Sequence, residues 1–229
     1  FARRTVTPGD AGPVRVEEYL QDPASIETLG APFRITLQQR SGAPLGRTTY
    51  AWGRHLYGSG QETRRFGYPS SVTLERYELD GVRVSSTVVT NVFDTYGTPV
   101  QRQSTTTEHA KGINPYAQHV ETVSLSGVVN DASNWCLGRP ATTLVTRQHT
   151  LSGGAAVTRT TAHSWDYARC RATQQVVEPS STSLRVTTDL AYDSYGNVGV
   201  ETVTPVGQPA RTTTVTWGEN GRFVTARTN

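Results

Sequence analysis

The chain has 229 residues, a formal net charge of +3 and 35% hydrophobic residues. That length allows one large all-β domain or two small ones, and the hydrophobic content is low for a globule with one thick core. The basic residues are scattered and no apolar stretch is long enough to cross a membrane as a helix, which argues against a nucleic-acid-binding face and against a spanning helix.

Residues 1–45 are predicted to hold strands and loops that lead into the main part of the chain. Valines alternate briefly with charged residues, which predicts a strand near residues 13–20 and a loop from there to about residue 31. Residues 33–39 alternate apolar and polar side chains, which predicts a half-buried strand. No stretch has a convincing helical period; residues 15–21 are the best helical candidate.

Residues 46–70 are rich in glycine and aromatic residues. This composition predicts a hairpin with a long, well-packed connection. The alternative is an aromatic surface for sugar or peptide, because rings are good stacking faces. Its candidate residues are Trp52, Tyr57, Tyr68 and Trp135.

A second hairpin is expected over residues 71–93, where both arms alternate with a two-residue period. Asp80-Gly81 between the arms favours a two-residue turn. Turn-forming pairs over residues 105–119 predict a loop. Further strands are expected over residues 120–129, 141–150 and 157–165, with residues 135–140 opening the second of them.

The clearest element is a hairpin centred on Tyr192-Asp193-Ser194-Tyr195-Gly196-Asn197-Val198, with alternating runs on both sides. The Asp193 side chain can accept a hydrogen bond from a backbone N–H two residues on. Gly196 can adopt a positive φ at no steric cost, and Asn197 tolerates the left-handed region. Because a β-branched residue would be strained there, Gly196→Val is expected to lower the melting temperature.

The same aromatic-led turn recurs along the chain. Its aromatic starts at residues 165, 192 and 217 lie 27 and 25 residues apart. A period in the twenties indicates a repeat array in which each hairpin packs on its neighbours. One copy loses the glycine, and another has Asn-Gly as its turn. The turn residues are Phe93, Asp94 and Gly97; Trp165 and Asp166; Tyr192, Asp193, Gly196 and Asn197; and Trp217, Asn220 and Gly221.

The chain has two cysteines, Cys136 and Cys170, which are too few for a four-ligand zinc site. Two buried free thiols and one disulfide in an exported protein are both open. If the two residues bridge, reduction will raise the intact mass by about 2 Da, the mass of two hydrogen atoms. The chain starts at Phe1 and contains no methionine, so we expect an internal fragment or a processed piece that lacks its targeting segment.

No constellation of catalytic or metal-binding residues is visible. The five histidines lack metal-ligand spacing, and no Gly-x-Ser-x-Gly motif is present. A calcium loop would need alternating acidic ligands and a distal glutamate, which the turn at Asp193 lacks. We therefore predict no catalytic residue, no metal, no cofactor and no enzymatic activity.

These turns resemble the hallmark of the RHS/YD-repeat family, Tyr-Asp-x-x-Gly followed shortly by a strand. The match is good at residues 192–197, whereas residues 93–100, 165–172 and 217–224 are looser copies. Residues 135–140 (Trp-Cys-Leu-Gly-Arg-Pro) also resemble the segment that leads into a repeat block in bacterial members. The resemblance covers about residues 46–229, and residues 1–45 add strands but no motif.

The resemblance implies an all-β fold, an array of long antiparallel hairpins that forms a curved, open sheet as part of a shell. In bacterial RHS-type toxins, which are related to Tc-toxin C components, such a shell encloses a toxic C-terminal segment until delivery. Related repeats occur in cell-surface adhesion proteins. The family's self-cleaving end uses aspartates in a glycine-rich motif that is absent here, so no catalytic residue carries over.

The function that we expect is therefore a shell-wall scaffold in a secreted or cell-surface protein. Its expected partners are other segments of the same or a longer RHS shell and the enclosed C-terminal segment, with self-association through open strand edges as a further possibility. No nucleic-acid partner is expected. The alternative is a carbohydrate-binding or adhesive β-module that uses exposed aromatic side chains.

Overall fold

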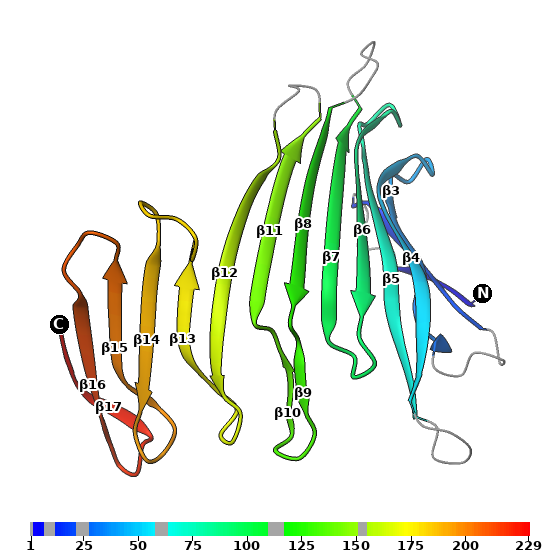
Figure 1. Cartoon of the computed structure of the whole chain (residues 1–229). Coiled ribbons are helices and arrows are strands. Elements are labelled where there is room, and N and C mark those ends of the chain that lie inside the picture. The colour runs from blue at the N-terminus through cyan, green and yellow to red at the C-terminus, as the bar shows by residue number, and fades with distance from the viewer. Residues whose placement is uncertain (1, 7–11, 22–27, 58–63, 110–116, 151–154) are drawn as a thin grey trace. The chain divides into compact units, whose positions relative to one another are not determined.

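The computed structural model describes residues 2–6, 12–21, 28–57, 64–109, 117–150 and 155–229. The described elements are strands, fifteen of which form one open antiparallel sheet, while the other two form a small separate hairpin. The strand order follows the sequence except that this hairpin is set aside between two sheet strands (Figure 1). The prediction of an all-β fold built from antiparallel hairpins in an open sheet is confirmed.

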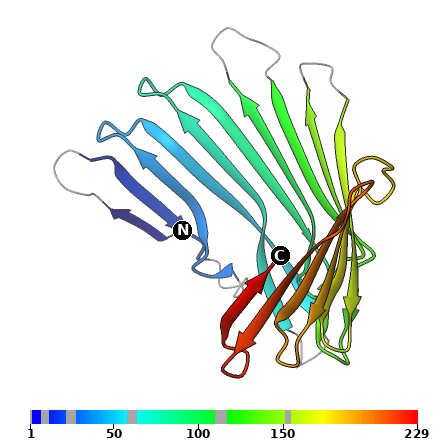
Figure 2. The same ribbon diagram turned by 90° about the vertical axis from the view of Figure 1, so that its left-hand side faces the viewer.

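The chain divides into two compact units that differ in strand length. The first unit comprises residues 1–123 and 146–157, and its longest strands have 14 residues. Figure 2 shows its strands, coloured from blue to green, in sequence order. They are β1 (Ala2–Val6), β2 (Val14–Tyr19), β3 (Pro32–Gln38), β4 (Pro44–Tyr57), β5 (Arg64–Tyr77), β6 (Arg83–Phe93) and β7 (Pro99–Glu108).

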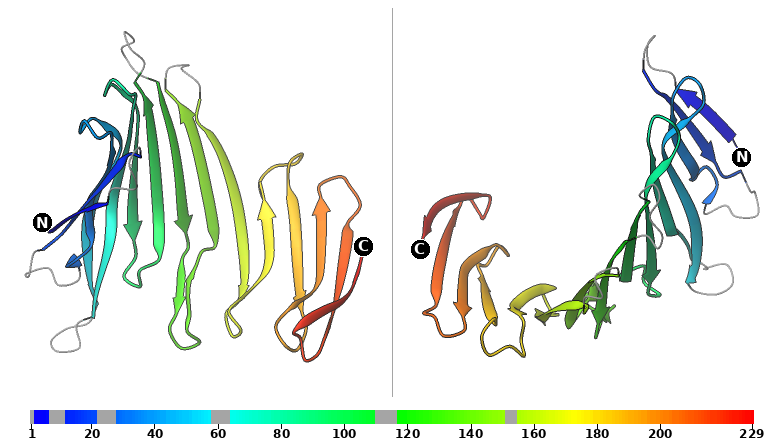
Figure 3. Two further views of the ribbon diagram at one scale, coloured as in Figure 1. Left: turned by 180° about the vertical axis from the view of Figure 1, so that it is seen from behind. Right: turned by 90° about the horizontal axis from the view of Figure 1, so that it is seen from above.

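The second unit comprises residues 124–145 and 158–229, and its repeat hairpins have shorter arms (Figure 3, left). Strands β8 (Gln118–Ser126), β11 (Thr142–His149) and β12 (Val157–Asp166) contain residues of both units. The remaining strands are β9 (Val129–Asp131), β10 (Cys136–Arg139), β13 (Arg171–Val177), β14 (Val186–Tyr192), β15 (Val198–Pro205), β16 (Arg211–Gly218) and β17 (Phe223–Thr228). The boundary expected at residue 45 falls within β4, inside the first unit.

The described residues form almost no core. Val16 and Cys136 are the buried hydrophobic residues among them, and most strand side chains are half-buried or exposed. The solvent-accessible area is 14539 Å², whereas a compact monomer of 24.9 kDa would expose about 10,000 Å². The low hydrophobic content of the sequence is therefore that of a single sheet layer with water on both faces.

Several local predictions need correction. Residues 15–21, the best helical candidate, contribute to β2, because their alternation fits the pleat of a sheet better than a helix. Residues 105–108 continue β7, and β8 begins at Gln118, so the loop expected over residues 105–119 is wrong at both ends. Residues 110–116 of that loop lie outside the described residues. Cys136–Arg139 pairs with β9 as a separate strand instead of opening β11.

The turn at Asp80-Gly81 also differs from the prediction. The N–H of Glu78 donates to Val82 and the N–H of Gly81 donates to Glu78, both through backbone carbonyls. Gly81 has a φ of 82°, but Asp80 is not in the left-handed region that a two-residue type I′ turn requires. The turn is therefore longer, with glycine as its one left-handed residue.

Candidate functional surface: the aromatic turns

Each predicted aromatic start follows a β-bulge. Ala191 pairs with Val200, but the next residue, Tyr192, pairs with Val198, so Gly199 is an extra residue on the return strand. The same shift precedes Trp52, Phe93, Trp165 and Trp217, and also Tyr19 and Tyr77. A bulge increases the local twist and re-aims the side chain beside it. The bulge in the backbone therefore fixes the direction in which the aromatic side chain points.

Asp94 and Asp193 build the same turn. One carboxylate oxygen of Asp193 accepts hydrogen bonds from the backbone N–H groups of Tyr195 and Asn197, both at 2.9 Å. The N–H of Gly196 donates to the backbone carbonyl of Asp193. Burial would raise the pKa of Asp193, but these backbone N–H groups and the Asn197 side chain together hold the pKa below its usual value. The aspartate thus organises the turn.

The turn at Asp94 has the same bonds. Its carboxylate accepts the N–H groups of Tyr96 and Thr98 at 2.9 and 2.8 Å, and the N–H of Gly97 donates to its carbonyl. The glycine of each turn is left-handed, with a φ of 84° at Gly97 and 96° at Gly196.

The other two copies are one residue longer. Trp165 pairs with Ala172 and Trp217 pairs with Val224, a spacing of seven residues in each case. In the first, Asp166 accepts the N–H of Arg169, and Cys170 takes the positive φ, at 53°.

In the last copy, three consecutive residues have positive φ: Glu219, Asn220 and Gly221. The N–H groups of Gly221 and Arg222 donate to the carbonyl of Gly218. The turn therefore places a third residue, Glu219, in the left-handed region, in addition to the Asn220-Gly221 pair that was predicted as the turn.

The aromatic side chains use their polar atoms to satisfy backbone carbonyls. The Tyr192 hydroxyl donates to the carbonyl of Ala172 at 2.7 Å, and the Trp217 indole N–H donates to that of Val198 at 3.0 Å. Trp165 donates likewise to Pro140, and Trp52 donates to Pro32. Backbone groups without a partner are costly, and a half-buried indole or phenol can supply the missing donor. We call this set of bonds the aromatic ladder.

Adjacent turns of the second unit also contact each other. The Asn197 side-chain amide donates to the carbonyl of Gly221 at 2.9 Å, and the Tyr195 hydroxyl donates to the Asn220 side chain. The guanidinium of Arg171 lies over the ring of Tyr192, 5.3 Å from its centroid. The predicted residues of the turns at Asp193 and Asn220 therefore contact each other at the same end of their hairpins.

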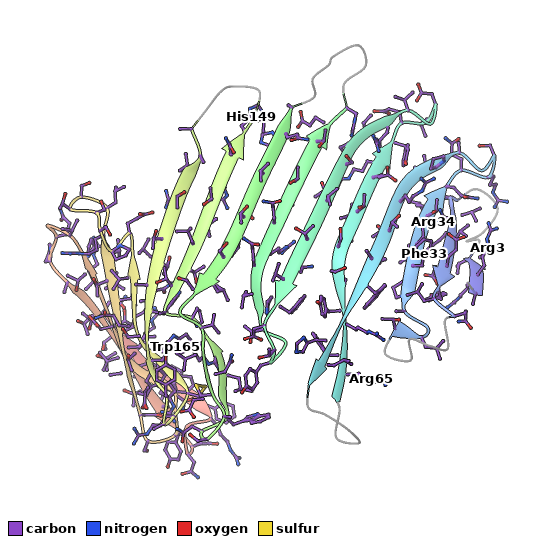
Figure 4. All side chains as sticks on the ribbon, turned by 45° about the vertical axis from the view of Figure 1, so that its right-hand side comes forward. Arg3, Phe33, Arg34, Arg65, His149 and Trp165 are labelled. Carbon is purple, nitrogen blue, oxygen red and sulfur yellow. A yellow bond between two sulfur atoms is a disulfide. The ribbon has the colours of Figure 1, made fainter. Side chains whose placement is uncertain are left out.

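Phe93 has no polar atom and takes part differently, in a cluster of rings in the first unit. Its ring lies 4.5 Å from that of Tyr68 and 5.9 Å from that of Phe66. Gly97 lies against Phe66, where an added Cβ would be 3.5 Å from the ring. Phe33 and Arg34 lie on β3 in the same unit (Figure 4), with the guanidinium 5.8 Å from the ring centroid.

Cys136 and Cys170 form a disulfide in the second unit, with 5.2 Å between their Cα atoms. The bond joins β10 to the turn that follows Trp165, which is labelled in Figure 4. Arg139 donates its Nε–H to the Cys170 sulfur at 3.2 Å and lies 5.0 Å from the Trp165 ring centroid. The disulfide thus ties the excursion of β9 and β10 to a repeat turn.

Sequence reasoning missed Asp131, which organises the turn between β9 and β10. Bonds from the side chains of Ser133 and Asn134, and from their backbone N–H groups, lower the pKa of Asp131 to about 2. The Asp-x-Ser-Asn order was a signal for such a turn. The carbonyl acceptors of the aromatic ladder gave no comparable signal, because any residue type has a carbonyl.

Two grooves lie in the first unit. One, of about 580 Å³, is lined by Phe33, Tyr50, Trp52 and Arg54 among others. The second, of about 500 Å³, contains His119 and His149 with ring centroids 4.4 Å apart, beside the Glu121–Arg147 ion pair.

Within the described ranges, no group of three or more histidine, cysteine or acidic side chains is placed to hold a metal ion. Likewise, none of the described elements is a helix long and apolar enough to cross a membrane.

The aromatic residues proposed for sugar binding are mostly engaged with the protein itself. Trp52 donates to Pro32 and stacks near Tyr50, and Tyr68 packs in the Phe93 cluster. Trp135 is exposed, with 75% of its surface accessible. The side chain of Tyr57 lies outside the described residues.

Comparison with known proteins gives a similarity of fold. No family model matches the chain, and no curated protein matches it. A chain in the crystal structure of TcdB2-TccC3-Cdc42 is similar, with a TM-score of 0.57 and 10% sequence identity. The match covers 86% of this chain and 14% of that chain, so this chain spans a small part of the length of its structural neighbour. The fold of this chain is thus similar to that of part of a chain in the TcdB2-TccC3-Cdc42 structure.

Proposed function

We propose that this chain is a wall segment of a secreted RHS/YD-repeat protein, whose sheet encloses or presents a C-terminal toxic or effector segment. The observation that carries the proposal is the single-layer sheet of fifteen strands with two buried hydrophobic residues among those described. A wall needs area, and it does not need a thick core. A chain that worked as a compact binding domain would bury more of its surface.

The fold neighbour supports this proposal. Most of this chain superposes on part of a chain in the TcdB2-TccC3-Cdc42 structure. The family that the turns resemble includes Tc-toxin C components, so motif and fold lead to the same class of protein. The partners that follow are further segments of such a shell and the segment that it encloses.

The disulfide supports export. Disulfides persist in oxidising compartments and are rare in the cytosol. Cys136 is fully buried and bonded to Cys170. We therefore extend the proposal to a secreted or cell-surface location, with no catalytic role for this chain.

The test uses the natural gene product that contains this sequence, treated with a protease under native conditions and after mild loosening by urea. A shell wall predicts that one segment outside this chain resists cleavage until the sheet is loosened. Cleavage of every segment at equal rates in both conditions would contradict enclosure. A matched sample without protease controls for spontaneous breakage.

The adhesive alternative has its own test on the 229-residue chain. Trp135 is the exposed candidate ring, whereas Trp217 is half-buried and bonded within the ladder. Glycan-array binding that is lost in Trp135→Ala and kept in Trp217→Phe would favour an adhesive module. An array without signal would leave the wall as the better account.

A further inference from the structure

Two histidines lie side by side in the second groove of the first unit. His119 is on β8 and His149 is the last residue of β11, where Figure 4 labels it, and the two strands are neighbours in the sheet. Their ring centroids are 4.4 Å apart, with 58° between the ring planes. His119 is exposed and His149 is half-buried, so an ion from solution can reach the pair.

The backbone fixes the contact between the two rings. The N–H of Thr150 donates to the carbonyl of Gln118 at 3.0 Å, which makes these residues a hydrogen-bonded pair. The next pair inward, His119 and His149, is then a non-hydrogen-bonded pair, in which opposing side chains lie closest. The strands themselves therefore hold the two imidazoles together, as a binding site requires.

The charges around the pair are balanced. Glu121 and Arg147 lie two positions further along β8 and β11, on the same face, and form an ion pair at 2.6 Å. Among the described residues that line the groove, Arg147 is the one cation besides the histidines, and Glu121 neutralises it. A metal ion at the pair would therefore meet no uncompensated positive charge in the groove.

The separation of the rings fits one coordination geometry. Metal–nitrogen bonds of about 2.0 Å at a right angle place two imidazole centroids about 4.5 Å apart, whereas a tetrahedral angle needs about 5.2 Å. The observed separation of 4.4 Å matches the right angle. Right angles are typical of Cu²⁺ and Ni²⁺ with nitrogen and oxygen ligands, whereas structural Zn²⁺ sites are tetrahedral.

We propose that His119 and His149 bind one Cu²⁺ ion between β8 and β11, with water in its remaining positions. Copper binds more tightly than nickel or zinc to a given set of nitrogen and oxygen ligands. One nitrogen of each ring is sufficient, so the other can keep a hydrogen-bond partner. The sequence prediction of no metal rested on spacing along the chain, which does not show a pair formed across two strands.

Copper binding is measured by isothermal titration calorimetry on the untagged chain of 229 residues, at about pH 7.5, where imidazole is mostly neutral. One ion per chain is expected. The variants His119→Gln and His149→Gln should each weaken binding at least about tenfold, since loss of a group that merely orients a ligand costs about 10–100-fold. His55→Gln, in β4 and outside the groove, is the matched control and should keep the wild-type affinity.

Three outcomes of the titration would overturn the site. Equal affinity of the wild type and both pair variants would show that the pair is not the ligand. A loss in only one of the two variants would reduce the site to a single histidine. Tighter binding of Zn²⁺ than of Cu²⁺ would contradict the assignment of the metal.

Two measurements on the wild type do not depend on how the variants fold. Electron paramagnetic resonance of bound Cu²⁺ should show coupling to two imidazole nitrogens, and coupling to one or none would contradict the pair. Copper at a hundredfold excess over its Kd should slow amide exchange that requires β8 and β11 to separate by about a hundredfold, because only the paired strands bind the ion. Unchanged exchange in β8 and β11 would contradict a bridge between the strands.

The copper site does not rest on the proposed wall function. Its tests use this chain alone with a metal ion, whereas the enclosure test uses a protease on the natural gene product. A failure of one is therefore distinguishable from a failure of the other.

Discussion

The two units build hairpins with the same bulge and turn but stabilise them differently. In the first unit, ion pairs join neighbouring strands. Arg34–Glu18 joins the short strands β2 and β3, and Glu75, between Arg47 and Arg83, joins the longer strands β4, β5 and β6. Arg15–Glu17 and Arg147–Glu121 lie in this unit as well, whereas Arg169–Asp166 lies in the second unit. In the second unit, repeat strands of seven or eight residues are joined by the aromatic ladder, and a disulfide ties in one turn.

This difference teaches how a sheet without a core is held together. The 14-residue strands β4 and β5 make many backbone hydrogen bonds, and the ion pairs of Glu75 add to them. The seven- and eight-residue strands β13 to β16 of the second unit make fewer backbone hydrogen bonds, and their turns add contacts. The second unit therefore concentrates its specific contacts at the hairpin ends. The two kinds of contact respond to different perturbations, which allows the comparison to be tested.

Loss of the disulfide should have the largest effect, confined to the second unit. The bond closes a loop with a sequence separation of 34, for which chain entropy gives about 3–4 kcal/mol. The double variant Cys136→Ser/Cys170→Ser should speed amide exchange in β10, β12 and β13, with β4–β6 unchanged. Mass spectrometry of hydrogen exchange measures both units in one sample. Wild-type protein treated with reductant is the matched control, and equal acceleration in both units would contradict the separation.

Gly221→Ala should have the next largest effect and lower the free energy of unfolding by about 2–3 kcal/mol. Gly221 has a φ of 80°, and an added Cβ would lie 2.6 Å from the Tyr195 Cβ and 2.8 Å from the Asn197 side-chain nitrogen. Gly81 has a similar φ of 82° with open space around it, so Gly81→Ala isolates the backbone strain, about 1 kcal/mol. Urea denaturation measures both, and equal losses would show that turn-to-turn contact contributes nothing.

Gly196→Val, expected from the sequence to be destabilising, belongs to the same series. Gly196 has a φ of 96°, and its added Cβ would lie 2.9 Å from the Arg171 guanidinium, the flexible end of a side chain that can move. The strain at positive φ is therefore the larger part of the cost.

The sequence predicted the elements well because their determinants are local. Alternation of apolar and polar residues marked β3, β5, β6, β14 and β15, and turn residues marked the hairpin at Asp193. The loop type at Asp80-Gly81 was wrong, because a two-residue pattern does not show where the flanking strands stop pairing. The excursion of β9 and β10 was also missed, since its position depends on a disulfide between residues far apart in sequence.

The aromatic ladder could not be predicted in the same way. The recurrence of Trp165, Tyr192 and Trp217 was visible, but their acceptors are backbone carbonyls, which leave no trace in the sequence. The bulge before each ring depends on register between strands. The alternation of residues shows which side chains share a face of a strand. The geometry of the turn decides whether the pairing shifts by one residue, and alternation does not show this.

Trp217→Phe should cost about 1 kcal/mol, because the ring is kept while the Val198 carbonyl loses its donor. Trp52→Phe in the first unit removes the corresponding bond to Pro32 and should cost the same. The double variant Trp217→Phe/Tyr192→Phe should depart from additivity, since the two turns share the Asn197–Gly221 bond. Urea denaturation of the single and double variants measures this. Strict additivity would mean that the ladder bonds act independently.

Mild acid should give the smallest effect, and it should reach β4–β6, which loss of the disulfide leaves unchanged. Burial would raise the pKa of the Glu75 carboxyl, but bonds from Arg83 and Tyr77 and the charge of Arg47 hold the pKa below its usual value. Its contribution is therefore complete above the unfolded pKa of about 4.3 and is lost as pH falls through the lower folded pKa. Between pH 6 and pH 3, the protection factors of amides in β4–β6, which compare each exchange rate with that of an unprotected amide at the same pH, should fall by an amount that corresponds to about 0.5–1 kcal/mol. Glu75→Gln should remove that dependence, whereas Glu201→Gln in β15 serves as the control and should preserve it. A loss of protection of the same size in the Glu75→Gln variant would contradict the assignment of this acid effect to Glu75.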